Sequence, residues 1–135
     1  NQMNPNGALA NNLRTLDAAL AALRNSLGNA WRHSVVLVAT EFGREVAVNG
    51  TMGSDHGTGG AAFVLGGAVA GGRVITDWPG LAKSQRHEGR DLRVTTDLRA
   101  VMKGVLADHL KLPGAVIENT VLPGSAAVKK LSVLA

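Results

Sequence analysis

The sequence contains no cysteine, and only 3% of its 135 residues are aromatic. The absence of cysteine excludes disulfide bonds and zinc sites that are built from thiolates. The scarcity of aromatic residues, with no RNA-binding aromatic motif, indicates that the chain does not bind nucleic acid. No apolar run reaches transmembrane length without a charge or a glycine, so the sequence also predicts no membrane span.

The chain lacks a visible signal peptide, and it begins with Asn1 rather than methionine. We therefore expect a piece of a longer protein or a processed product. Its length fits one domain, and its 45% of apolar residues suffice for a core. The predicted organisation is a single domain, or the C-terminal part of a larger α/β domain, with a polar lead-in at 1–7, an exposed loop at 77–93 and a tail at 119–135.

Basic residues outnumber acidic ones by 14 to 10, which gives a net charge of +4. The arginines and lysines are scattered along the chain and form no dense stripe of the kind that follows a nucleic-acid backbone. An excess of positive charge suits small anionic substrates equally well. We therefore predict a small anionic molecule as the partner.

The N-terminal part of the sequence predicts one long helix. Leucines recur at steps of four and three from residue 9 to residue 27, which places them in a single stripe. Gly28 is a suitable residue to follow the last turn. The same stripe fits a coiled coil, but three heptads are few and a strand follows at once. We therefore expect the helix 8–27 to pack against a sheet.

Two apolar runs predict strands of a parallel sheet. The run at 34–40 is continuous and rich in β-branched residues, which is typical of a strand buried on both faces. A second run follows at 61–66, and a short strand is expected at 73–76. Thr96 is a suitable N-cap for a second helix, which Asp97 favours through the helix dipole. The predicted fold class is therefore α/β, with a mainly parallel sheet and flanking helices.

Chemically capable residues gather around the ends of these strands. Glu41 and Arg44 directly follow the first run, and a glycine-rich loop at 53–60 carries Asp55 and His56. Because ligands of open α/β sheets bind beyond the carboxyl ends of the strands, we expect these residues to share one site. Carboxylates and imidazole without cysteine suit Zn²⁺ or Mn²⁺, and carboxylates alone suit Mg²⁺ or Ca²⁺. Glu41, Asp55 and His56 are therefore candidate metal ligands, and Arg44 is a candidate for binding an anion.

The same residues also fit purely structural roles. Glu41 could form an ion pair with Arg44. Asp55 could cap an Asx-turn in its loop, and His56 could bond to the backbone. The loop glycines could let backbone N–H groups approach an anion, or could simply permit a positive φ. The residues alone leave both interpretations open.

The order of these motifs resembles the C-terminal part of the alkaline phosphatase and sulfatase superfamily. The resemblance rests on Thr-Glu-Phe-Gly, Gly-Ser-Asp-His-Gly, Phe-Val-Leu-Gly-Gly and Thr-Thr-Asp-Leu, at 40–43, 53–57, 63–67 and 95–98. More specifically, the chain resembles a bacterial sulfatase-like family, the domain of unknown function 1501. The segments that carry this likeness are Glu-Phe-Gly-Arg, Asp-His-Gly, Gly-Gly-Arg-Val, Trp-Pro-Gly-Leu and Glu-Gly-Arg-Asp-Leu, at 41–44, 55–57, 71–74, 78–81 and 88–92.

The resemblance implies the C-terminal fragment of an alkaline-phosphatase-like domain, from a metal-dependent hydrolase of phosphate or sulfate esters. It supports Glu41, Asp55 and His56 as ligands of a divalent metal. The nucleophile of the superfamily lies near the start of the domain, so this chain would be an enzyme only together with the upstream part of the same protein. Family members often carry a twin-arginine export signal, which implies a periplasmic or exported protein.

One departure from the superfamily pattern supports a different function. Phe42 stands where the superfamily has a metal-binding histidine. The alternative is therefore a non-catalytic exported binding protein that keeps the fold with a degenerate metal site.

Overall fold

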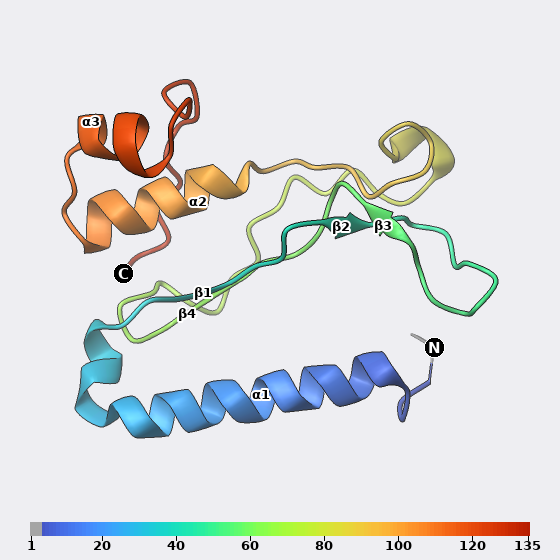
Figure 1. Ribbon diagram of the computed structural model, residues 1–135, viewed down its shortest axis with the longest axis horizontal. Helices are drawn as coiled ribbons and strands as arrows, with labels where there is room; N and C mark the ends of the chain where they lie inside the picture. Colours follow the sequence, from blue (N-terminus) through green and yellow to red (C-terminus); the bar gives the residue numbers. More distant parts are fainter. Residues whose placement is uncertain (1–3) are drawn as a thin grey trace. The chain divides into compact units, whose positions relative to one another are not determined.

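The computed structural model describes residues 4–135 (Figure 1). The chain divides into two compact units, each made of segments that are distant in sequence. The first unit comprises residues 1–30, 39–62 and 78–94, and the second comprises 31–38, 63–77 and 95–135. Each unit contains one pair of short strands.

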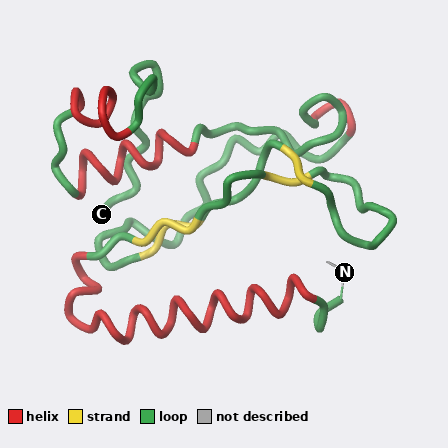
Figure 2. Tube along the Cα trace, in the orientation of Figure 1, coloured by secondary structure: helices red, strands yellow, loops and turns green. Residues whose placement is uncertain are grey.

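Apart from the first helix, the helices and strands are short and are joined by long loops (Figure 2). The helices are α1 (Ala8–Leu27), α2 (Leu98–Gly104) and α3 (Gly114–Val116), with 3₁₀ turns at Gly28–His33 and Lys83–Gln85 and π-helical turns at Val105–His109 and Ile117–Val121. The strands are β1 (Val36–Val38), β2 (Gly43–Arg44), β3 (His56–Gly57) and β4 (Phe63–Leu65). Between residues 4 and 135, no helix combines the length and the apolarity that crossing a membrane requires.

α1 has the bounds that its leucine pattern predicts, so this helix is confirmed. It ends at Gly28, where φ is 50° and the N–H donates to the carbonyl of Arg24. Glycine adopts this backbone conformation without strain. No residue of α1 is buried, and Leu13 of the leucine stripe is 50% exposed. The expectation that this helix flanks a sheet is therefore wrong.

The strands form two separate antiparallel pairs, β1 with β4 and β2 with β3. The prediction of a mainly parallel sheet is therefore wrong. The two apolar runs pair with one another, with Leu37 opposite Val64. A continuous apolar run indicates burial, but it does not determine the direction of the neighbouring strand. The strand expected at 73–76 is absent too, and Val74 is 88% exposed.

Buried apolar side chains hold the second unit together. Within residues 4–135 they are Ala100, Ile117 and Val133. Main-chain hydrogen bonds attach the C-terminal tail on two sides: the Leu131 N–H donates to the Ala100 carbonyl at 2.9 Å, and the Ala70 N–H donates to the Val133 carbonyl at 3.0 Å. The tail therefore links α2 to the segment that follows β4.

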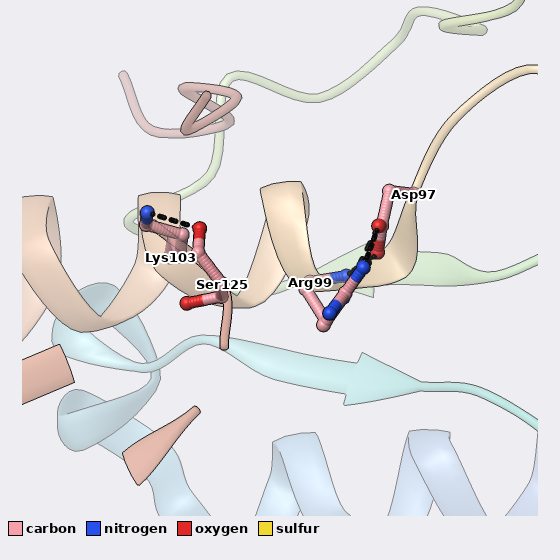
Figure 3. A network of polar contacts seen from close by, with 4 residues as sticks. All are labelled: Asp97, Arg99, Lys103 and Ser125. Atoms are coloured by element: carbon pink, nitrogen blue, oxygen red, sulfur yellow. Dashed lines mark hydrogen bonds and ion pairs between the residues drawn. The ribbon is translucent and has the colours of Figure 1, made fainter. Parts of the chain in front are cut away.

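α2 begins directly after Asp97, whose carboxylate accepts a hydrogen bond of 2.9 Å from the Arg99 N–H. The expected N-cap, Thr96, lies one residue too early, because it is Asp97 that reaches the free amides of the first turn. The Arg99 side chain also forms an ion pair with Asp97, with 2.6 Å between Nη2 and Oδ2 (Figure 3). These hydrogen bonds from Arg99 lower the pKa of the Asp97 carboxyl.

Candidate functional site

A ring of main-chain hydrogen bonds joins three segments of the first unit. The Arg44 N–H donates to the Gly59 carbonyl at 2.8 Å, and the Gly59 N–H donates to the Leu92 carbonyl at 2.9 Å. The Leu92 N–H donates back to the Arg44 carbonyl at 3.1 Å, which closes a ring of three hydrogen bonds. We call the segments 43–46, 57–59 and 90–92 the backbone junction.

Two buried glycines make this close approach of main chains possible. A Cβ atom on Gly43 would lie 1.9 Å from the Gly59 carbonyl oxygen, and one on Gly59 would lie 2.4 Å from the Leu92 carbonyl oxygen. Neither glycine has a positive φ. The Gly59 N–H is already bonded to Leu92, so it is not available to an anion. Gly59 therefore neither adopts a positive φ nor offers its N–H to an anion. Its lack of a side chain lets the main chains pack closely.

Asp91 is a buried carboxylate within the backbone junction, with 5% of its surface exposed. Its Oδ1 accepts a hydrogen bond of 2.7 Å from Arg90 Nε. This bond is the largest cause that lowers the pKa of Asp91, and a hydrogen bond from the Thr58 backbone N–H acts in the same direction. Asp91 was not among the predicted site residues, although the Glu-Gly-Arg-Asp-Leu segment at 88–92 contains it.

The ladder of β2 and β3 brings Arg44 and His56 together. They are opposite one another in the register, and opposed residues of an antiparallel pair project from the same face. The Phe42 ring centroid lies 4.4 Å from that of His56 at an angle of 67°, and the Arg44 guanidinium lies 5.5 Å from the Phe42 ring. Arg44 Nη1 also donates to the Ser54 carbonyl at 3.1 Å. Arg44, His56 and Phe42 therefore form one cluster.

Asn49 holds the Asp55 carboxylate next to this cluster. Its Nδ2 donates to Asp55 Oδ1 at 2.8 Å, and its Oδ1 accepts from the N–H groups of Thr51 and Gly53 at 3.1 and 3.0 Å. The Asx-turn of the loop is therefore capped by Asn49 and not by Asp55. The local sequence Asn49-Gly50 is typical of a tight turn and gives no sign of these contacts, because they depend on how the loop folds back.

Glu41 is exposed and lies outside both strand pairs. The four ion pairs found between residues 4 and 135 include neither Glu41 nor Arg44, so the structural alternative that would pair these two is absent. In the described part of the chain, no three histidine, aspartate or glutamate side chains lie close enough to hold a metal ion. Glu41, Asp55 and His56 therefore do not form a metal site by themselves, and their role as ligands stays a prediction.

A second polar cluster lies in the second unit, around a buried lysine. Lys103 on α2 is 6% exposed, and its Nζ donates to Glu118 Oε1 at 2.6 Å. It also donates to the Ser125 carbonyl at 3.0 Å (Figure 3). Ser125 is fully buried, and within residues 4–135 its hydroxyl has no hydrogen-bond partner. Lys103 was not among the predicted site residues, because a lysine on an amphipathic helix normally faces solvent.

The model of a family described as protein of unknown function (DUF1501) matches residues 3–121. No curated protein and no solved structure matches the chain. The matched region contains the whole backbone junction, the cluster around Arg44 and His56, and the Lys103–Glu118 pair.

Proposed function

The chain belongs to the DUF1501 family, and we propose that it is the C-terminal portion of a hydrolase of phosphate or sulfate esters, of the sulfatase and alkaline phosphatase type. In this proposal, Arg44 and His56 bind the anionic group of the ester. The observation that carries it is the opposed placement of these two side chains on a ladder that the backbone junction holds.

The chemistry of the cluster suits a tetrahedral anion. A guanidinium has five N–H donors, and the Ser54 carbonyl occupies only one Nη of Arg44. Arg44 therefore keeps donors for two ester oxygens, while the exposed imidazole of His56 can donate to a third. A support made of main-chain bonds limits how far these groups can move apart, which favours binding of an anion in one orientation.

The nucleophile and any complete set of metal ligands would come from the upstream part of the same protein. Asp55 and His56 are positioned to contribute to such a set, since Asn49 fixes the Asp55 carboxylate and the Phe42 ring lies against His56. Glu41, Asp55 and His56 do not form a group of three that could hold a metal ion. We therefore assign no metal-dependent catalytic step to this chain.

A non-catalytic binding protein is the second candidate function, and two observations favour it. Phe42 occupies the place of a metal-binding histidine in the pattern that the chain resembles. Within residues 4–135, no metal-binding group of three side chains is present. Metal analysis separates the candidates, because a hydrolase would hold stoichiometric divalent metal when its upstream part is present and a degenerate binding protein would not.

The proposal is tested by titrating the chain with inorganic phosphate and with sulfate while recording amide NMR spectra. We expect the signals of Arg44, His56 and Gly57 to shift, and Arg44→Gln to weaken binding about tenfold. Arg24→Gln, at an exposed position of α1, is the matched control and should leave the affinity unchanged. Equal weakening by both variants, or no shift at Arg44 and His56, would contradict the proposal.

Turnover is measured separately on aryl phosphate and aryl sulfate with added Zn²⁺, Mn²⁺ or Mg²⁺. We expect none from the 135-residue chain, because a hydrolytic metal site needs three protein ligands and an open position. Multiple turnovers that His56→Ala abolishes would show that the chain carries a complete site, and the assignment of a partial one would be wrong.

A further inference from the structure

A cavity in the second unit has no part in the proposed function. Its volume is about 380 Å³, which lies within the range of small-molecule sites. Its lining combines aliphatic and charged residues: Ala107, Gly114, Ile117, Ala126 and Val128 with Lys103, Glu118, Lys129 and Lys130. A ligand of this cavity would therefore contact both aliphatic surface and charged groups.

The buried Lys103 retains one donor on the cavity wall. An ammonium group has three N–H bonds, and two of them reach Glu118 and the Ser125 carbonyl. The third N–H of Lys103 has no acceptor within residues 4–135. A buried ammonium favours an additional acceptor, because unused donors away from water are unfavourable.

The charges on the wall leave one cation unmatched. Lys103 is paired with Glu118, and Lys130 is paired with Asp108, which also accepts a hydrogen bond of 2.7 Å from the Ser132 hydroxyl. Lys129 forms no ion pair or hydrogen bond with the described residues. One unmatched cation complements a single negative charge, and the nearby Glu118 carboxylate disfavours a dianion.

We infer that this cavity binds a small aliphatic carboxylate, with the carboxylate between Lys103 and Lys129 and the hydrocarbon part against Ala107 and Val128, which are both partly exposed. The carboxylate accepts the third N–H of Lys103 and neutralises Lys129. The hydrocarbon part covers apolar wall that is otherwise open to water, which is favourable in proportion to the area removed from solvent. This site is independent of the cluster around Arg44, and either can fail without the other.

The test is an amide NMR titration of the chain with hexanoate. Acetate carries the same charge without the hydrocarbon, and hexan-1-ol carries the hydrocarbon without the charge. We expect hexanoate to shift the signals of Ala107, Ile117 and Val128 in a saturable way, with at least about tenfold higher affinity than either partial ligand. Equal affinity for hexanoate and acetate, or shifts confined to other residues, would refute the inference.

Two variants assign the contacts. Lys129→Gln should weaken hexanoate binding about fivefold, whereas Lys83→Gln, at an exposed lysine of the first unit, should leave it unchanged. Ala107→Leu should fill the cavity and abolish the signal shifts that hexanoate causes. An unfolding midpoint close to that of the unchanged chain shows that this variant keeps its fold. Equal effects of the two lysine variants, undiminished binding to a folded Ala107→Leu variant, or tighter binding of inorganic phosphate than of hexanoate at these residues would each overturn the proposal.

Discussion

The backbone junction and the second unit are held together by different chemical groups. Main-chain hydrogen bonds connect the three segments of the junction, and its two buried glycines contribute no side chain at all. The second unit relies on side chains, with Ile117 in its core and the Lys103–Glu118 pair beside it. Removal of side-chain atoms should therefore damage mainly the second unit. Addition of atoms should damage the junction, and in the second unit it should do so where main chains also come close, as at Gly104, whose added Cβ would lie 2.0 Å from the Leu131 carbonyl oxygen.

The largest effect is expected from Gly43→Ala. The new methyl group would lie 1.9 Å from the Gly59 carbonyl oxygen, so the main chains must separate and the ring of hydrogen bonds must open. We expect a loss of about 4 kcal/mol in the free energy that protects the Arg44, Gly59 and Leu92 amides from hydrogen exchange. Gly50→Ala is the control, because no atom lies within 4 Å of its added methyl. If these amides kept their protection in Gly43→Ala, the junction would be able to accommodate a methyl group, and the prediction would be wrong.

Ile117→Ala should have the next largest effect, and in the other region. Ile117 is 1% exposed, and its truncation removes buried apolar contacts and leaves a cavity. We expect a loss of about 3 kcal/mol in the free energy of unfolding, measured by urea denaturation. Val116→Ala, at a side chain that is 41% exposed, should change this free energy by less than about 0.5 kcal/mol. Similar losses in both variants would contradict a core centred on Ile117.

The smallest effect is a dependence on pH that both regions share. Hydrogen bonds from Arg90 and from Lys130 lower the pKa of Asp91 in the junction and of Asp108 in the second unit. A carboxyl with a lowered pKa in the folded state contributes stability above its unfolded pKa, which is about 4. This stability is lost as the pH falls through the folded pKa. We therefore expect the protection factors for hydrogen exchange, which are corrected for the intrinsic rate at each pH, to fall in both regions below about pH 4.

Matched variants assign the two contributions. Asp91→Asn should remove the acid dependence of exchange at the junction amides and leave that of the second unit unchanged. Asp108→Asn should do the reverse. If Asp91→Asn flattened the pH dependence in both regions, the two carboxylates would not be acting separately.

The sequence predicted those features that depend on neighbouring residues. The leucine spacing predicted α1 to the residue, and both apolar runs contain the strands β1 and β4. The start of α2 was predicted within one residue, because a capping side chain is recognisable from the local sequence. Arg44 and His56 were singled out from their motifs, and the structure pairs them.

The features that the sequence did not predict depend on partners distant in the chain. The direction of strand pairing follows from which runs meet, and the run at 34–40 meets the run at 61–66 antiparallel. Burial of Asp91 and Lys103 follows from contacts with Thr58, Glu118 and Ser125. Charged residues of this kind are normally exposed, so their local sequence gives no signal.

The closed ring of main-chain hydrogen bonds has a consequence for how this site can evolve. Since the ring uses no side-chain atoms, the side chains at 44 and 56 can be exchanged while the support beneath them is kept. Function can therefore diversify at these two positions with little loss of stability, in the way that loops on a fixed scaffold do. Gly43 and Gly59, by contrast, cannot be exchanged in this way, because every larger residue at these positions would disrupt the main-chain support itself.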